Sequence, residues 1–140
     1  MRDMMNNIHT VPAIAPVVVA DNTAQVSAII DLQNYDACTF VITTGTLADV
    51  DATFAVTMDH GNVSNLSDAA AVTSADLVGS YALAGFTFAD DGETRKIGYV
   101  GARRYVRLTI TPSANTGNAP LAAIAVLGLP RSAATANPPQ

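Results

Sequence analysis

The side chains that could carry out chemistry are few in this chain and lie far apart in the sequence. The two histidines are His9, near the start, and His60, beside a Gly-Asn turn, and neither has a second metal-ligating residue at a suitable spacing. His60 follows Asp59, but neighbouring residues of a strand point to opposite faces, so an acid–base pair is not expected. We therefore predict that His60 is a solvated turn residue.

Cys38 is the only cysteine, which excludes an internal disulfide and a CxxC metal or redox site. It opens an apolar run with Phe40 and Ile42, where a cysteine usually packs as a small hydrophobic residue. We predict a buried thiol at this position, not a nucleophile.

An acidic turn is the remaining candidate site. Asp90, Asp91 and Glu93 place three carboxylates within four residues, and carboxylate oxygens are calcium ligands. Their spacing differs from that of a helix-loop-helix calcium loop, and acidic residues are common in tight turns for conformational reasons. The chain also lacks a glycine-rich phosphate-binding motif. We predict no enzyme activity, no metal and no cofactor.

Length and composition predict one domain that works with partners. The chain has 140 residues, of which 49% are hydrophobic and only 14% charged, so a core can form while few charges keep a free surface soluble. Twelve acidic and seven basic residues, a net charge of -5, argue against nucleic-acid binding, which needs a basic face. The most apolar stretch, residues 11–20, contains Pro12 and Pro16 and is shorter than the roughly 20 residues of a membrane span.

The elements that must position these residues are short strands. Apolar and polar residues alternate with a period of two in residues 103–111, 53–59, 25–32 (broken at Ile29) and 38–44, as in half-buried strands. Asp91-Gly92 predicts a hairpin turn between residues 86–88 and 95–100, and only residues 66–77 suggest a short helix. We predict an all-β, two-sheet antiparallel β-sandwich, jelly-roll-like, with a small closed barrel as the alternative.

The chain divides into an extended N-terminal arm (1–20), a β-sandwich domain (21–131) and a flexible C-terminal tail (132–140). We expect the arm to add as a strand to the sheet edge of a neighbouring subunit, with Pro12 and Pro16 marking where pairing stops. The alternative is that the arm packs on its own subunit as a first strand. The arm residues assigned to partner binding are Val17, Val18 and Val19.

Residues 121–127 are apolar at every position, so both faces of this strand are apolar. An edge strand of a monomer does not have this pattern. Either the strand is central and covered on both sides, with the arm over it, or its second face is buried against another chain.

Charge is distributed unevenly along the chain. Residues 1–93 hold all twelve acidic residues and one arginine, a net -11, whereas residues 94–140 hold six basic residues and no acidic one. A basic patch on two neighbouring strands is predicted from Arg95, Lys96, Arg103, Arg104 and Arg107. These side chains either face aspartates of the same subunit or meet an acidic surface of a neighbour and set its orientation. A polyanion such as packaged DNA is the third alternative.

Three segments resemble small virion structural proteins of tailed bacteriophages: residues 31–41 (DLQNYDACTFV), 99–108 (YVGARRYVRL) and 125–131 (AVLGLPR). The resemblance spans roughly residues 24–131. It implies a β-sandwich that decorates, cements or stabilises the phage head, located in the virion after synthesis in the host bacterial cytoplasm. The implied partners are the major capsid protein and further copies of the chain, for example in a trimer, without direct binding to nucleic acid or membrane.

A second resemblance keeps an alternative function open. Residues 104–108 are similar to a strand of discoidin-like carbohydrate-binding sandwiches, which often pair it with an Asp-Gly-x-x-Trp hairpin. The corresponding turn, residues 59–63, reads Asp-His-Gly-Asn-Val and lacks the aromatic residue. A carbohydrate- or receptor-binding module is therefore the second hypothesis, a neck or tail component the third, and an enzyme the least expected.

Overall fold

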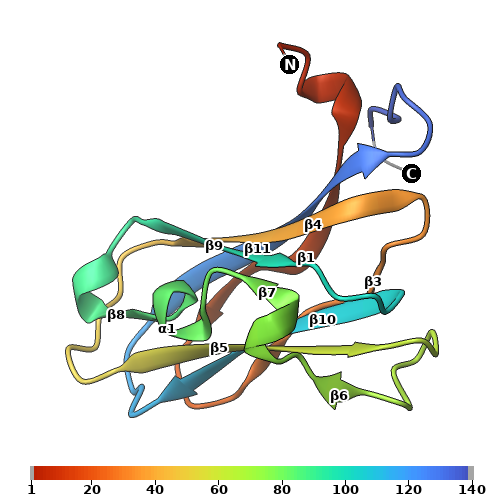
Figure 1. Ribbon diagram of the computed structural model, residues 1–140. Coiled ribbons are helices and arrows are strands. Elements are labelled where there is room, and N and C mark those ends of the chain that lie inside the picture. Colours follow the sequence, from red (N-terminus) through yellow and green to blue (C-terminus); the bar gives the residue numbers. More distant parts are fainter. Residues whose placement is uncertain (1, 139–140) are drawn as a thin grey trace.

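Two antiparallel sheets pack face to face in the computed structural model, which describes residues 2–138 (Figure 1). The first sheet has the strand order β1 (Ile8–Val19), β11 (Ala119–Pro130), β4 (Tyr35–Thr44), β9 (Thr94–Tyr99) and β7 (Leu77–Val78). The second has the order β2 (Gln25–Val26), β10 (Tyr105–Ser113), β5 (Thr53–Gly61) and β6 (Ala70–Ala71), with β3 (Ile30–Asp31) also on β10 and β8 (Phe86–Thr87) also on β5. The predicted all-β sandwich is confirmed, and it is not a closed barrel.

The core lies between the sheets because each long strand alternates as its sequence predicts. On β10, Val106, Leu108 and Ile110 point inward and are fully buried, while the residues between them are partly exposed. Phe40 and Ile42 of β4 do the same from the first sheet. This packing of two apolar faces is the main stabilising contribution to the sandwich.

The strand predicted at residues 25–32 is interrupted by Ser27. The buried Ser27 hydroxyl accepts a hydrogen bond from Leu108 N–H and donates one to the Ala28 carbonyl, while Ser27 N–H donates to the Leu108 carbonyl. One serine therefore replaces the regular ladder, leaving two short pieces, β2 and β3, on the same edge of β10. The break in alternation at Ile29 was the sequence signal of this interruption.

The predicted Asp91-Gly92 hairpin is wrong. β8 pairs with β5 in the second sheet and β9 pairs with β4 in the first, so the turn carries the chain from one sheet to the other. The Asp91 carboxylate accepts a hydrogen bond from Leu47 N–H, and Gly92 N–H donates to the Gly45 carbonyl. These contacts dock the turn on the loop at residues 45–47. Gly92 does have the positive φ, 62°, that such turns require.

The helix predicted within residues 66–77 is also absent from the described chain. The Asp68 carboxylate accepts hydrogen bonds from Asn62 and Val63 N–H, and Leu66 has a φ of 54°, which no right-handed helix allows. The segment instead contains β6 and the 3-10 turn η2 (Ser74–Asp76). The short α-helix is α1 (Tyr81–Ala84), where the Ser80 hydroxyl caps Leu83 N–H. Two further 3-10 turns are η1 (Met5–Asn7) and η3 (Phe88–Asp90).

Residues 8–19, most of the predicted arm, form β1 and pair with β11 of their own chain. The structure thus adopts the alternative in which the segment packs as a first strand on its own subunit. The physical reason is β11: without β1, one whole edge of this long apolar strand would be unpaired. Val17, Val18 and Val19 lie opposite Leu121, Pro120 and Ala119. No helix in residues 2–138 is long and apolar enough to cross a membrane.

The core assignment predicts different costs for two truncations. Leu108→Ala removes a side chain that is 0% exposed between the sheets, and we expect the free energy of unfolding to fall by about 2–5 kcal/mol. Ile124→Ala trims a β11 side chain that is 41% exposed, and we expect a fall of less than about 1.5 kcal/mol in the isolated chain. Urea unfolding of both variants measures the difference, and equal costs would contradict the assignment of the inner face.

Candidate functional site

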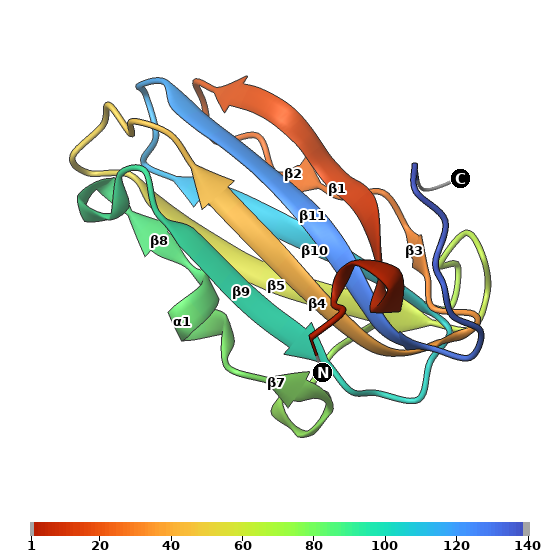
Figure 2. The same ribbon diagram turned by 90° about the horizontal axis from the view of Figure 1, so that it is seen from above.

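The outer face of the first sheet is apolar and uncovered. Within residues 2–138, no helix or loop crosses the middle of this face, which is turned toward the viewer in Figure 2. Strand register places the following residues of its four longest strands on this side, and they are defined here as the outer face: Ile8, Thr10, Pro12, Val18, Ala37, Thr39, Val41, Thr43, Thr94, Lys96, Gly98, Pro120, Ala122, Ile124, Val126 and Gly128. Lys96 is the only charged member. β11, which contains residues 121–127, is central within its sheet, as in the first alternative. The arm lies beside it and not over it, so this chain covers only one of its two faces.

The opposite face of the molecule is polar. On the outside of the second sheet, Arg107 of β10 pairs with Asp59 of β5 at 3.3 Å, and threonines such as Thr109 and Thr111 occupy much of the remaining length of β10. This face has the ordinary chemistry of a solvated sheet surface. The outer face also contains four threonines, but it has more apolar side chains and fewer charges than the second sheet, so it is the face better suited to burial against a partner.

The sheet edges are protected against strand addition. On β1, Pro12 and Pro16 lack an N–H group, the Ala13 carbonyl accepts from Ala28 N–H, and the Ile8 carbonyl accepts from the Thr135 hydroxyl. The other edges are built from strands of two residues, β7 in the first sheet and β2, β3, β6 and β8 in the second. Short edges and prolines are common devices against edge-to-edge pairing. Association through a face is therefore favoured over association through an edge.

An apolar groove of about 370 Å³ lies at one end of the outer face. It is lined by Val17 and Val18 of β1, Thr43 of β4, and Pro120 and Ala122 of β11, among others. Two of the three predicted arm residues thus lie beside the uncovered face, although they pair within their own chain.

The five basic residues predicted to form one patch are divided among three places. β9 and β10 belong to different sheets, so Arg95 and Lys96 lie apart from Arg107, and Arg103 and Arg104 lie in the loop before β10. All four of these arginines have carboxylate partners in the same chain, which matches the intramolecular alternative. The pairs are Arg95 with Asp90 (2.6 Å) and Glu93 (2.7 Å), Arg103 with Asp68 (3.8 Å), Arg104 with Asp31 (2.8 Å), and Arg107 with Asp59 (3.3 Å).

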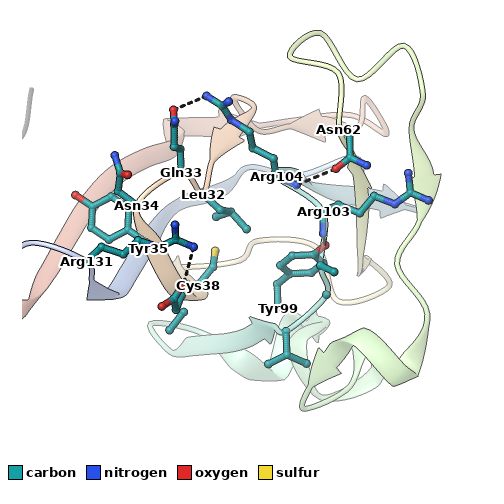
Figure 3. Close-up of a pocket in the computed structure, with 15 residues that line it drawn as sticks. Leu32, Gln33, Asn34, Tyr35, Cys38, Asn62, Tyr99, Arg103, Arg104 and Arg131 are labelled. Carbon is teal, nitrogen blue, oxygen red and sulfur yellow. Dashed lines mark hydrogen bonds and ion pairs between the residues drawn. The ribbon is translucent and has the colours of Figure 1, made fainter.

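A polar cleft of about 420 Å³ opens at one end of the sandwich, and Figure 3 shows its lining. The three segments that resemble phage virion proteins meet here: residues 32–38, residues 99–104 and Arg131 all line the cleft. Arg104 donates two hydrogen bonds of 2.8 Å to Asp31 and one of 2.6 Å to Gln33. This donation holds the pKa of the Asp31 carboxyl below its ordinary value. The contact between Arg104 and Asp31 could not be predicted from the sequence, because the two residues are 73 positions apart.

His60 is not the solvated turn residue that was predicted. It is only 8% exposed, and its Nδ1 lies 2.9 Å from the Tyr99 hydroxyl, with the two rings edge to face. The Tyr99 hydroxyl also accepts a hydrogen bond of 3.1 Å from Arg103 N–H. A side chain at Gly101 would collide with Tyr99, so glycine is required there. The pair joins β5 to β9 across the two sheets and fixes the loop that carries Arg103.

The other two candidates are Cys38 and the acidic turn at residues 90–93. Cys38 is buried as predicted, and burial raises the pKa of its thiol to about 12. The three carboxylates of the acidic turn have separate partners within the chain. Asp90 accepts a hydrogen bond from Thr87 N–H and pairs with Arg95, Asp91 accepts one from Leu47 N–H, and Glu93 pairs with Arg95. Within residues 2–138, no three histidine, cysteine or acidic side chains are grouped so that they could hold a metal ion.

Comparison with known proteins gives likeness of fold only. No family model matches the chain, and no curated protein matches it in sequence. Among solved structures, the capsid of Ralstonia phage GP4 is similar with a TM-score of 0.53 and 12% identity, over 94% of this chain and 90% of that one. The SPBc2 prophage-derived protein YomS has a TM-score of 0.47 and 8% identity, over 86% and 93% of the two chains. The xylan-binding module CBM15 has a TM-score of 0.46 and 10% identity, over 93% and 95%.

The Tyr99 hydroxyl can be tested by deletion. Tyr99→Phe leaves His60 Nδ1 and Arg103 N–H without their partner, so we expect the free energy of unfolding to fall by about 1–3 kcal/mol. Tyr105→Phe is the matched control, because the Tyr105 hydroxyl has no hydrogen-bond partner among the described residues. A loss in urea unfolding that is equal for both variants would contradict the bridging role.

The buried thiol predicts slow alkylation. A free thiol with an ordinary pKa is partly ionised at pH 8 to 9, whereas Cys38, with a pKa near 12, stays protonated. We expect iodoacetamide to modify the native chain at least about a hundredfold more slowly than the urea-unfolded chain at the same pH. Mass spectrometry of timed samples measures both rates, and rapid labelling of the native chain would show that the thiol is accessible and ionised.

Proposed function

We propose that this protein is a non-enzymatic structural subunit of a tailed phage particle, which binds the head shell as a decoration or cement subunit and stabilises it. The observation that carries the proposal is the outer face of the first sheet, which is uncovered, mostly apolar and has a single charged residue. A subunit with this face has one surface that gains free energy when another protein covers it.

The size of the face fits a specific protein contact. Its four main strands have 12, 12, 10 and 6 residues, which at about 3.3 Å per residue and about 4.8 Å between strands gives roughly 600 Å² of flat sheet. Stable protein interfaces bury about 800 Å² of accessible surface on each partner, and side chains make the accessible surface larger than the flat area. The face alone therefore supplies most of a standard interface.

Two likenesses support a phage particle as the place of that contact. The segments at residues 31–41, 99–108 and 125–131 resemble virion structural proteins, and a phage capsid has a similar fold over most of both chains. The proposed partner of the outer face is the major capsid protein, and the proposed location is the virion. Direct binding to nucleic acid is not proposed, because the chain has a net charge of -5 and the arginines at positions 95, 103, 104, 107 and 131 pair with its own carboxylates.

Carbohydrate or receptor binding is the alternative, and the polar cleft is the observation that favours it. Amide groups of Gln33, Asn34 and Asn62 and ion-paired arginines line this cleft, which offers donors and acceptors to a polar ligand (Figure 3). The aromatic platform on which sugars usually stack is poor, because Tyr99 is buried and Tyr35 is stacked on His9. The shell-binding function is therefore the one that the geometry supports best.

The copy number of the chain in purified phage particles tests the proposal. Quantitative mass spectrometry compares the amount of this chain with that of the major capsid protein in the same sample. For a decoration subunit we expect a copy number of the same order as that of the shell subunits, which is a ratio of the order of one. A few copies per particle would instead identify a neck or tail component, and absence from particles would favour the soluble binding module.

The role of the outer face is tested with a pair of charge substitutions. Ile124→Asp places an unpaired carboxylate on this face, and we expect its affinity for shells of the major capsid protein to fall at least about tenfold, or 1.4 kcal/mol. Thr111→Asp places the same charge on the polar outside of the second sheet and should leave binding unchanged. Co-sedimentation with shells measures both, and equal binding by both variants would contradict the assigned face.

A further inference from the structure

We propose that Lys96 selects the partner of the outer face: this face binds a different protein that presents a carboxylate opposite Lys96, and not a second copy of this chain. The inference rests on the proposed function, because it concerns the same face, and it adds the chemistry of the partner. It is carried by the position of Lys96, by its lack of a carboxylate and by the composition of the face around it.

Lys96 ends a row of side chains that crosses four strands. In the register of the first sheet, Pro12 lies opposite Ile124, Ile124 opposite Val41, and Val41 opposite Lys96. Three apolar side chains thus lead directly to the ammonium group. A protein that covers this row also covers the stem of Lys96 and brings its own atoms close to the charge.

Lys96 differs from the arginines of the sandwich in having no carboxylate within 4.0 Å among the described residues. Its neighbour Arg95 points to the opposite side of β9, where it pairs with Asp90 and Glu93. Arg103, Arg104, Arg107 and Arg131 also have carboxylate partners. Lys96 is the only lysine of the chain and is exposed.

Covering an unpaired ammonium group is unfavourable unless the partner supplies an opposite charge. A carboxylate within about 4 Å offsets this cost and also fixes the orientation of the two proteins. The outer face contains no acidic residue, so a second copy packed face to face would offer Lys96 no carboxylate. A different protein can cover the apolar row with an apolar surface and pair with the Lys96 ammonium group through one suitably placed aspartate or glutamate.

The test uses three variants of the full chain and shells assembled from the major capsid protein of the same phage. Lys96→Met keeps the length of the side chain but removes the charge, and Lys96→Glu reverses it. Arg2→Glu is the control, because this exposed residue precedes the first strand and lies off the face. Binding is measured by co-sedimentation at about 0.05 M and about 0.5 M NaCl, since salt screens exposed charge pairs.

We expect Lys96→Met to bind a few-fold more weakly than the wild type at low salt and to lose most of the salt dependence. Lys96→Glu should bind at least about tenfold more weakly at low salt, because two carboxylates then face each other. The control should bind like the wild type. If the wild type binds shells and both Lys96 variants bind as tightly as the wild type, the inference is wrong while the proposed function stands.

Sedimentation velocity of the chain alone separates the remaining outcomes. A monomer at micromolar concentration is expected, since the face does not complement itself in charge. A concentration-dependent dimer that Ile124→Asp abolishes and Lys96→Glu does not would identify a second copy as the occupant and overturn the inference. Failure of the wild-type chain to bind shells at any salt concentration would overturn the proposed function itself.

Discussion

The architecture depends on β11, a strand of twelve residues that is apolar on both faces. Its inner side chains, such as Leu121 and Leu127, are buried between the sheets, and its neighbours β1 and β4 pair with both of its edges. A single sandwich has only one interior, so the second apolar face of β11 is left outside. Polar residues on that face would have been sufficient for folding, and their absence is the observation on which the proposed partner contact rests.

Charge shows the opposite behaviour, because it is largely satisfied within the chain. Acidic residues come from the first 93 positions and basic residues mainly from the rest, and the sandwich brings the two sets together in pairs such as Arg104 with Asp31 and Arg107 with Asp59. Each exposed pair contributes little to stability. None of the paired arginines lies on the first sheet's outer face, where Lys96 is the single charged residue.

Period-two alternation was enough to predict the sandwich, the inner faces of β5 and β10, and the two apolar faces of β11. Contacts between distant residues could not be predicted. Ser27 interrupts a strand through a hydrogen bond to Leu108, and the Asp91-Gly92 turn crosses between sheets because it docks on residues 45–47. His60 is buried against Tyr99, 39 residues away, and its Nδ1 forms a hydrogen bond with the Tyr99 hydroxyl. The single basic patch was predicted wrongly because β9 and β10 join different sheets. The local spacing of residues carries no information on which sheet a strand joins.

Covalent labelling of side chains in intact particles tests the central claim most directly. Hydroxyl-radical footprinting, read by mass spectrometry, compares the oxidation of each side chain in the free chain with that in purified particles. The account predicts that Ile124, Val126 and Val41 are labelled in the free chain and protected in the particle, whereas Tyr105 on the second sheet is labelled in both. Protection of Tyr105 together with unchanged labelling of Ile124 would show that the particle covers the other face, and would contradict the account.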